Sequence, residues 1–286
     1  MNFTKMQGAG NDFILIESDD SERNWLDMAK NMCHRRFGIG ADGLLLLLPS
    51  KSADFRMRIF NSDGSEAEMC GNGIRCLAKY IVESGLVDIG IKEMSVETMS
   101  GIRRIKLSKS EGRLTEIQAG MGKPDFVAHK IPVLLDSKRV DSLDIINIIN
   151  YPVTIKNREL LLSFISMGNP HAVYFYDQPI SDFPLSEMGP EVEKHGIFPN
   201  RINFEVARIM SRNLIHARVW ERGAGETLAC GTGACAIAVA AQVHGYVDNK
   251  VDIMLPGGLL NIEWDGVEEV LLSGPAEIVF TGSWPE

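Results

Sequence analysis

The feature that most constrains the fold of this 286-residue chain is an internal repeat at an offset near 160 residues. Arg58-Ile59-Phe60 precedes Cys70-Gly71-Asn72-Gly73 by the same spacing with which Arg218-Val219-Trp220 precedes Cys230-Gly231-Thr232-Gly233. Other pieces repeat in the same order, and their offsets drift slightly, as expected when surface loops gain or lose residues. One matched tetrapeptide could arise by chance, but an ordered series indicates two homologous halves.

Each half has the local pattern of strands around one helix. Apolar runs that alternate with polar residues predict strands, a glycine-rich turn carries the cysteine, and a helix with an apolar face follows. The fold class we expect is therefore α+β, with two homologous domains. The predicted strands are 13–16, 44–48, 55–60, 102–107 and 259–264, and the predicted helices carry Ile74, Leu77, Ala78 and Ile81 in the first half and Ala234 to Val243 in the second.

The repeat also sets the domain limits. We expect a first domain over residues 1–122, joined by the final segment 275–286, and a second domain over residues 123–274. The two cysteine turns would then face each other across a cleft between the domains, which is where the active site is expected.

Composition narrows the class of protein. The net charge is −9, which makes a nucleic-acid partner unexpected. No apolar run reaches the roughly 18–20 residues that span a bilayer, and the N-terminus lacks the layout of a signal peptide. With five cysteines, an odd number, and no export signal, we expect a cytoplasmic protein with free thiols rather than a disulfide framework.

The two Cys-Gly-X-Gly turns are the candidate chemistry. The start of a helix presents free N–H groups and a positive dipole, so it favours an anion and is expected to lower a thiol pKa toward neutrality. Two such thiols on opposite sides of a carbon could remove a proton from one face and return one to the other. This pattern predicts a racemase or epimerase that needs no cofactor.

Three other interpretations of these turns stay open on the residues alone. A cysteine near a helix start is often a small buried residue, and we expect Cys76 and Cys235 to be core residues. For Cys33 we expect a core or partly exposed position. Structural zinc sites use short Cys-x-x-Cys spacings that this chain lacks. A phosphate-binding loop would continue with a lysine and a hydroxyl residue, which follow neither turn.

The motifs together resemble one family, the diaminopimelate epimerases. The resemblance runs in order from residue 5 to about residue 260 and includes several individually specific segments. The segments that carry it are Lys5 to Phe13, Phe60 to Ser65, Met69 to Cys76, Ser166 to His171, Arg201 to Phe204, Glu221 to Thr227, and Ala229 to Ala234.

The resemblance implies a cytoplasmic, homodimeric isomerase of lysine and cell-wall precursor synthesis. It would interconvert LL- and meso-diaminopimelate without pyridoxal phosphate or a metal. Cys70 and Cys230 would be the acid/base thiols, and His171 and Glu221 would adjust their pKa values. The residues implied to bind substrate are Asn11, Asn61, Gly71, Asn72, Asn169, Asn203, Glu221, Arg222, Gly231 and Thr232.

Two alternatives to this function are a related cofactor-free racemase of proline or hydroxyproline and an amino-acid-binding protein without activity. A substrate with one carboxylate would not need the second charged binding group that the Asn-Pro-His and Glu-Arg segments suggest. An isomerase of the phenazine-biosynthesis type would not be expected to keep both cysteines. One position departs from some relatives, which carry Gln where this chain has Gly43.

Overall fold

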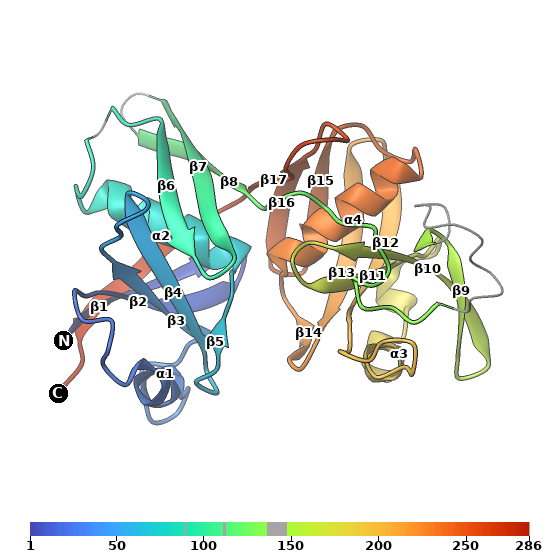
Figure 1. Cartoon of the computed structure of the whole chain (residues 1–286), viewed down its shortest axis with the longest axis horizontal. Coiled ribbons are helices and arrows are strands. Elements are labelled where there is room, and N and C mark those ends of the chain that lie inside the picture. Colours follow the sequence, from blue (N-terminus) through green and yellow to red (C-terminus); the bar gives the residue numbers. More distant parts are fainter. Residues whose placement is uncertain (89, 111–112, 136–147, 286) are drawn as a thin grey trace. The chain divides into compact units, whose positions relative to one another are not determined.

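The computed structural model describes residues 1–88, 90–110, 113–135 and 148–285. It divides into two compact units, of which the first comprises Met1–Gly120 and Ser273–Glu286 and the second Met121–Leu272 (Figure 1). Each unit is a curved mixed sheet with a helix packed against it, and the two units repeat the same order of strand pairing.

The sheet of the first unit begins with the two ends of the chain. Strand β18 pairs antiparallel with β1, which pairs antiparallel with β2. The order continues through β3, β4, β6, β7 and β8, and the β2–β3 and β4–β6 pairs are parallel. The bounds are β1 Asn2–Gly8, β2 Asn11–Glu17, β3 Gly43–Leu48, β4 Phe55–Asn61, β5 Glu66–Ala67, β6 Glu93–Thr98, β7 Gly101–Ser110, β8 Arg113–Gly120 and β18 Glu277–Ser283.

Helix α2, Gly71–Glu83, lies in the middle of the first unit and contacts strands from both ends of this order, including β18, β1 and β8. Ile74, Leu77, Ala78 and Ile81 are fully buried, as the apolar spacing predicted. They pack with strand residues in one core. A second, shorter helix, α1 (Trp25–Cys33), covers the other face of β3 and β4. Strand β3 is therefore buried on both faces, which explains its run of five leucines.

The second unit repeats this pairing order. Strands β9, β10, β11, β12, β13, β15 and β16 follow one another, and β11–β12 and β13–β15 are the parallel pairs. Their bounds are β9 Tyr151–Ile155, β10 Arg158–Ser166, β11 Pro170–Phe175, β12 Asn203–Ser211, β13 Leu214–Glu221, β14 Gly225–Thr227, β15 Lys250–Leu255, β16 Gly258–Glu263 and β17 Leu271–Ser273.

Helix α4, Gly231–Val243, is the counterpart of α2 and contacts β10, β11, β12, β15 and β16. It begins three residues before the predicted segment because Cys230 caps its first turn. A short turn of helix, η2 (Ile180–Asp182), precedes α3 (Leu185–Glu193), which packs on β12 and β13. The expected α+β class with two homologous domains is confirmed by this common order.

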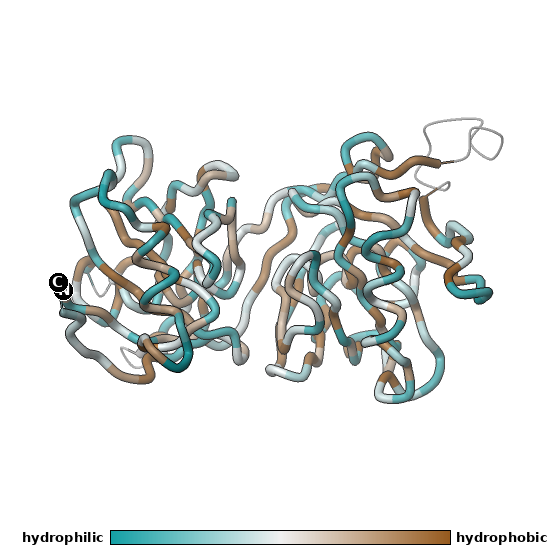
Figure 2. The backbone as a smooth tube through the Cα atoms, turned by 90° about the horizontal axis from the view of Figure 1, so that it is seen from below, coloured by the Kyte–Doolittle hydropathy of each residue, from teal (hydrophilic) through white to brown (hydrophobic). Residues whose placement is uncertain are grey.

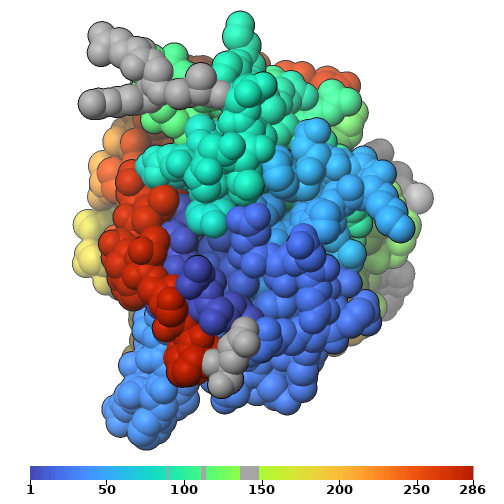
Figure 3. All heavy atoms as spheres, turned by 90° about the vertical axis from the view of Figure 1, so that its left-hand side faces the viewer, coloured from blue at the N-terminus to red at the C-terminus, as the bar shows by residue number. Residues whose placement is uncertain are grey.

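Hydropathy follows the architecture within each unit. Figure 2 shows brown, apolar segments along the strands, while many of the connecting turns are teal. The termini lie together in the first unit, where the Met1 amino group donates to the Trp284 carbonyl at 2.8 Å. Figure 3 shows β18 in red beside β1 in dark blue. Among the residues that the structure describes, no helix is long and apolar enough to cross a membrane.

Candidate active site

Both repeated cysteines are the N-caps of the central helices. The Cys70 sulfur accepts the backbone N–H of Gly73 at 3.4 Å, and the Cys230 sulfur accepts that of Gly233 at 3.4 Å. A side chain in this position satisfies one of the N–H groups that a helix leaves free at its start. The two thiols thus have the same local setting, at the positive end of a helix. All five cysteines of the chain are free thiols.

In the first unit, an amide side chain lies beside the thiol. Asn11, at the start of β2, has its Oδ1 3.8 Å from the Cys70 sulfur and accepts the Asn72 side-chain amide at 3.3 Å. Its own amide nitrogen donates to Asp42 Oδ2 at 2.7 Å. The structure therefore brings Asn11, Cys70 and Asn72 together, and Asp42 fixes which end of the Asn11 amide faces them.

A buried arginine that the sequence analysis did not single out supports this turn. Arg75 is fully buried and donates to the Gly71 carbonyl and to Asn72 Oδ1, both at 2.8 Å. These bonds hold the Asn72 side chain with its amide nitrogen toward Asn11. The available signal was an arginine directly after Ile74, in the first turn of a predicted helix.

Asn61 lies at the same end of the sheet, at the C-terminal end of β4. It pairs with Gly43 across the ladder, and its amide donates to the Ser65 hydroxyl at 2.9 Å. Gly43 leaves no room for the Gln found in some relatives. A Cβ atom on residue 43 would lie 2.9 Å from the Phe60 carbonyl oxygen.

In the second unit, the equivalent side chain is Asn169. Its amide nitrogen donates to the Thr232 hydroxyl at 3.2 Å, and that hydroxyl lies 3.5 Å from the Cys230 sulfur. Its Oδ1 faces His171 Nε2 at 2.9 Å. The structure therefore joins Asn169, His171, Thr232 and Cys230 in one chain of contacts.

The far end of this chain is Glu205, which the sequence analysis missed. Glu205 lies on β12 and is fully buried, and its Oε1 is 2.7 Å from His171 Nδ1. Burial raises the pKa of this carboxyl group, and the hydrogen bond with His171 opposes the rise. The signal that could have revealed it is a charged residue at a strand position where the first half has Leu45.

The expectation of a lowered thiol pKa is wrong for Cys230. Burial raises the pKa of this thiol well above its ordinary value, and the nearby charge of Glu221 raises it further. The hydrogen bonds with Thr232 and Gly233 act in the opposite direction but are outweighed. The helix start alone does not decide the acidity of a thiol that is almost fully removed from solvent.

Asn203 and Arg222 meet at the end of β13. The Asn203 side chain donates to the Pro170 carbonyl at 2.9 Å and accepts the backbone N–H of Arg222 at 2.8 Å. The exposed Arg222 guanidinium donates to the Asn200 carbonyl at 3.1 Å.

Glu221 accepts the Thr227 hydroxyl at 2.5 Å. The buried Glu193, also missed, accepts the Gly223 backbone N–H at 3.0 Å and so fixes this turn.

Taken separately, each unit presents a thiol, a helix start with free N–H groups and an amide side chain at one end of its sheet. Such a group can bind a carboxylate and exchange a proton with a neighbouring carbon. The expected facing of the two turns, and the substrate-binding roles of individual residues, stay predictions. Among the described residues, no group of three or more His, Cys, Asp or Glu side chains is arranged so that it could bind a metal ion.

Comparison with known families gives a match over most of the chain. The family model described as diaminopimelate epimerase matches residues 3–127 and 163–279. A curated diaminopimelate epimerase of Halothermothrix orenii is 45% identical over 285 residues, covering 99% of this chain and 97% of the relative. That of Methanococcus maripaludis is 42% identical over 284 residues, with 99% of both chains covered.

Solved structures of more distant proteins share the fold. A hydroxyproline epimerase from Agrobacterium vitis gives a TM-score of 0.70 at 14% identity, covering 99% of this chain and 91% of that one. A PhzF-family phenazine biosynthesis protein from Bacillus anthracis gives 0.67 at 18% identity, covering 99% and 98%. At these identities the likeness concerns the fold alone.

Proposed function

Because this chain belongs to the diaminopimelate epimerase family, we propose that it interconverts LL- and meso-diaminopimelate by proton transfer through Cys70 and Cys230. The reaction is an isomerisation that serves lysine biosynthesis. The observation that carries the mechanism is the identical capping of α2 and α4 by a cysteine sulfur. Two equivalent acid/base groups, one from each half of a duplicated chain, are what a two-base inversion requires.

The reaction transfers only protons between the two cysteines and the substrate carbon, so it needs no oxidant or reductant. One cysteine acts as thiolate and takes the α-proton, so that its S–H bond forms as the C–H bond breaks. The other cysteine, as thiol, gives its proton to the opposite face of the same carbon and becomes the thiolate. The enzyme then carries the opposite pair of protonation states and is ready for the reverse reaction.

The helix starts supply the electrostatic part of the mechanism. Removing an α-proton moves negative charge from the carbon onto the adjacent carboxylate. Backbone N–H groups of Gly71-Asn72 and Gly231-Thr232, at the positive ends of α2 and α4, would hold that carboxylate and stabilise the added charge.

The other end of the substrate carries a second carboxylate and ammonium group. We assign its binding to the amides of Asn11, Asn61, Asn169 and Asn203 and to the side chains of Glu221 and Arg222. Arg222 is exposed, and its guanidinium can pair with a carboxylate through two hydrogen bonds. His171 and Glu221 are assigned the adjustment of thiol acidity, supported for Glu221 by its effect on the pKa of Cys230.

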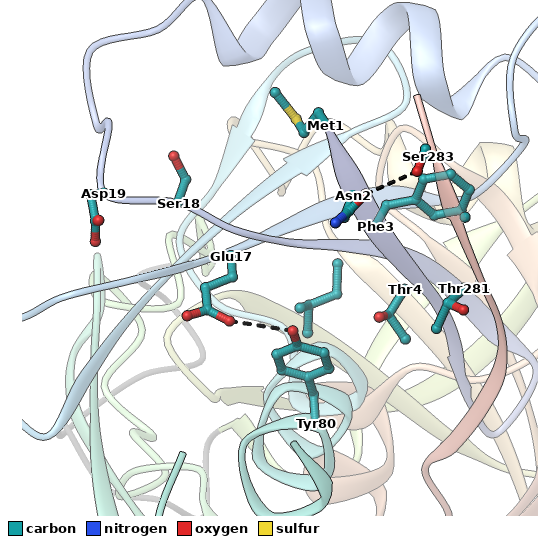
Figure 4. A pocket seen from close by; sticks show the side chains of 12 residues that line it. Met1, Asn2, Phe3, Thr4, Glu17, Ser18, Asp19, Tyr80, Thr281 and Ser283 are labelled. Carbon is teal, nitrogen blue, oxygen red and sulfur yellow. Dashed lines mark hydrogen bonds between the residues drawn. The ribbon is translucent and has the colours of Figure 1, made fainter. Parts of the chain in front are cut away.

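A homodimer is part of the proposal. About half of the surface of Val279 and Phe280 in strand β18 is exposed, which is unusual for paired apolar strand residues. Beside it lies a hollow of about 760 Å³ between β1, the end of β2 and β18, lined by residues that include Phe3, Glu17, Tyr80 and Thr281 (Figure 4). A second copy of the chain would cover this face. Size-exclusion chromatography with light scattering measures the mass, and a monomer would contradict the assignment.

We also propose a cytoplasmic location, supported by the biosynthetic role and by five free thiols.

Proton NMR of LL-diaminopimelate in deuterated water tests the function. The reduced protein, without pyridoxal phosphate, is expected to remove the α-proton signal and to produce the meso isomer. Proline and hydroxyproline are the comparison substrates. Exchange with those and not with diaminopimelate would contradict the proposal and favour the related racemase. Binding without exchange would favour the amino-acid-binding protein.

A further inference from the structure

Glu205 marks a difference between the two otherwise equivalent halves. The strand registers align β3 with β12, since Leu15 pairs with Leu45 as Val173 pairs with Glu205. On the other side, Leu45 pairs with Ile59 as Glu205 pairs with Val219. One half therefore has an aliphatic side chain where the other has a carboxylate.

Both side chains lie beneath the first turn of the central helix. A Cβ atom on Gly73 would lie 3.0 Å from Leu45 Cδ2. A Cβ atom on Gly233 would lie 3.0 Å from Glu205 Oε1 and 3.4 Å from the Cys230 sulfur. The Glu205 carboxylate is thus in the immediate surroundings of Cys230. Because Gly233 has no side chain, no Cβ atom lies between the carboxylate and the sulfur.

The Glu205 carboxylate is only half satisfied. Its Oε1 bonds to His171, whereas its Oε2 is buried and has no hydrogen-bond partner among the described residues. Burying a carboxylate in this way costs free energy that the Leu45 arrangement avoids. Such a cost is typical of groups that act on a neighbouring functional residue.

Several charged and polar groups face Cys230 from the elements around it. Burial opposes a negative charge on the sulfur most strongly, followed by Glu221 of β13 and then Glu205 of β12. The Thr232 hydroxyl and the Gly233 N–H of α4 favour such a charge. His171 of β11 is hydrogen-bonded to Glu205 and lies on its other side. A negative charge on Glu205 disfavours a second negative charge on the neighbouring Cys230 sulfur.

We propose that Glu205 is a positioning residue that holds Cys230 in its thiol form in the free enzyme, and that Leu45, at the equivalent position of the first half, has no such effect on Cys70. The inference deepens the proposed function and rests on it for its meaning. In the two-base reaction, the thiol form of Cys230 is the proton donor, so the free enzyme starts with Cys70 as the base. Glu205 thereby makes the two halves of the duplication chemically unequal.

The pH dependence of alkylation tests this proposal without substrate. Iodoacetamide labelling of each cysteine, followed peptide by peptide with mass spectrometry, gives a titration midpoint for Cys70 and for Cys230. In the unmodified protein, the Cys230 midpoint is expected to lie above that of Cys70. In Glu205→Gln, which keeps the size and an acceptor for His171, the Cys230 midpoint should fall by about one pH unit or more, which is roughly tenfold more thiolate at a given pH.

Controls separate this effect from loss of structure. Glu205→Leu introduces the residue that the first half has at the equivalent position, Leu45, and should also lower the Cys230 midpoint. The Cys70 midpoint should be unchanged in both variants. Glu193→Gln removes another buried carboxylate of the same unit and should leave the Cys230 midpoint unchanged. An unchanged or higher Cys230 midpoint in folded Glu205→Gln would overturn the proposal.

If a variant does not fold, the proposal is still tested by the two titration midpoints of the unmodified protein. A Cys230 midpoint at or below that of Cys70 would also overturn the proposal. A failure of the protein to act on diaminopimelate would leave these midpoints as expected, so the two outcomes are distinguishable.

Discussion

The Asn11 amide nitrogen donates to Asp42 Oδ2 at 2.7 Å, and this bond turns the Asn11 carbonyl oxygen toward Asn72 and Cys70. Asp42 also accepts the Asp12 backbone N–H at 3.0 Å and is paired with Arg35 at 2.6 Å. The orientation of a proposed substrate-binding amide is therefore set by a residue that need not touch the substrate.

Replacing Asp42 tests this orientation. In Asp42→Ala, the Asn11 amide loses its anchor, and kcat/KM for diaminopimelate should fall about tenfold, the size expected for one misplaced hydrogen-bonding group. Asp42→Asn keeps an oxygen acceptor and should lose less. Equal activity of the alanine variant and the unmodified protein would show that the anchor is not needed.

The two capping cysteines should be separately essential. Cys70→Ser and Cys230→Ser should each lower kcat by roughly 10²–10⁴-fold or more, because a serine hydroxyl is far too weak an acid to replace the thiol. Binding of diaminopimelate, measured by calorimetry, should be nearly unchanged. Cys76→Ala, a change at a buried cysteine of α2, is the matched control and should keep its turnover. Near-normal turnover in either serine variant contradicts a two-base reaction.

Gly43 should not accept the Gln found in some relatives. The Cβ atom would press against the Phe60 carbonyl oxygen at 2.9 Å, and the backbone of a central strand cannot move away easily. We expect Gly43→Gln to lower the free energy of unfolding by about 1–3 kcal/mol, the usual cost of overpacking. Gly196→Ala, where a Cβ would meet nothing within 4 Å, is the control. Denaturation midpoints that match in the two variants would refute the steric argument.

The ion pairs of Asp12 should stabilise the first unit above acidic pH. Burial alone would raise the pKa of Asp12, but hydrogen bonds from Arg35 and Lys5 hold it well below its ordinary value of 3.8. A carboxyl group with a depressed pKa stabilises the fold above that ordinary value, and the contribution is lost as the pH falls below it. The difference in Tm between the unmodified protein and Asp12→Asn should therefore be constant from about pH 5 to 8 and shrink below about pH 4. A difference that grows on acidification would reverse the assigned sign.

Much of the architecture could be predicted because its signals are local. The repeated Cys-Gly-X-Gly turns, the spacing of Ile74 and Ile81, and the leucines of β3 each depend on neighbours in the sequence. The cysteine turn was predicted to lie at the start of this helix, but the capping of α4 by the Cys230 sulfur was not, because it depends on the folded geometry.

The parts of the site that could not be predicted depend on packing between distant segments. The high pKa of Cys230 follows from burial and from Glu221, neither of which the helix start reveals. Arg75 and Glu205 are charged residues in buried positions, where pattern alone favours apolar side chains. Such residues can be found by comparing equivalent positions of the two halves. Leu45 and Glu205, for example, occupy the same register position in the same fold but differ in chemistry.

The most direct test of the two-base account follows the solvent isotope early in the reaction. LL-diaminopimelate is incubated with the enzyme in deuterated water, and at low conversion the remaining substrate and the new product are separated and examined by mass spectrometry. Two thiols acting on opposite faces predict deuterium at the inverted carbon of the meso product, while the remaining LL substrate keeps its α-proton. Product that retains the original proton would mean that one group removes and returns it, and would contradict the assignment of Cys70 and Cys230 as opposed acid and base.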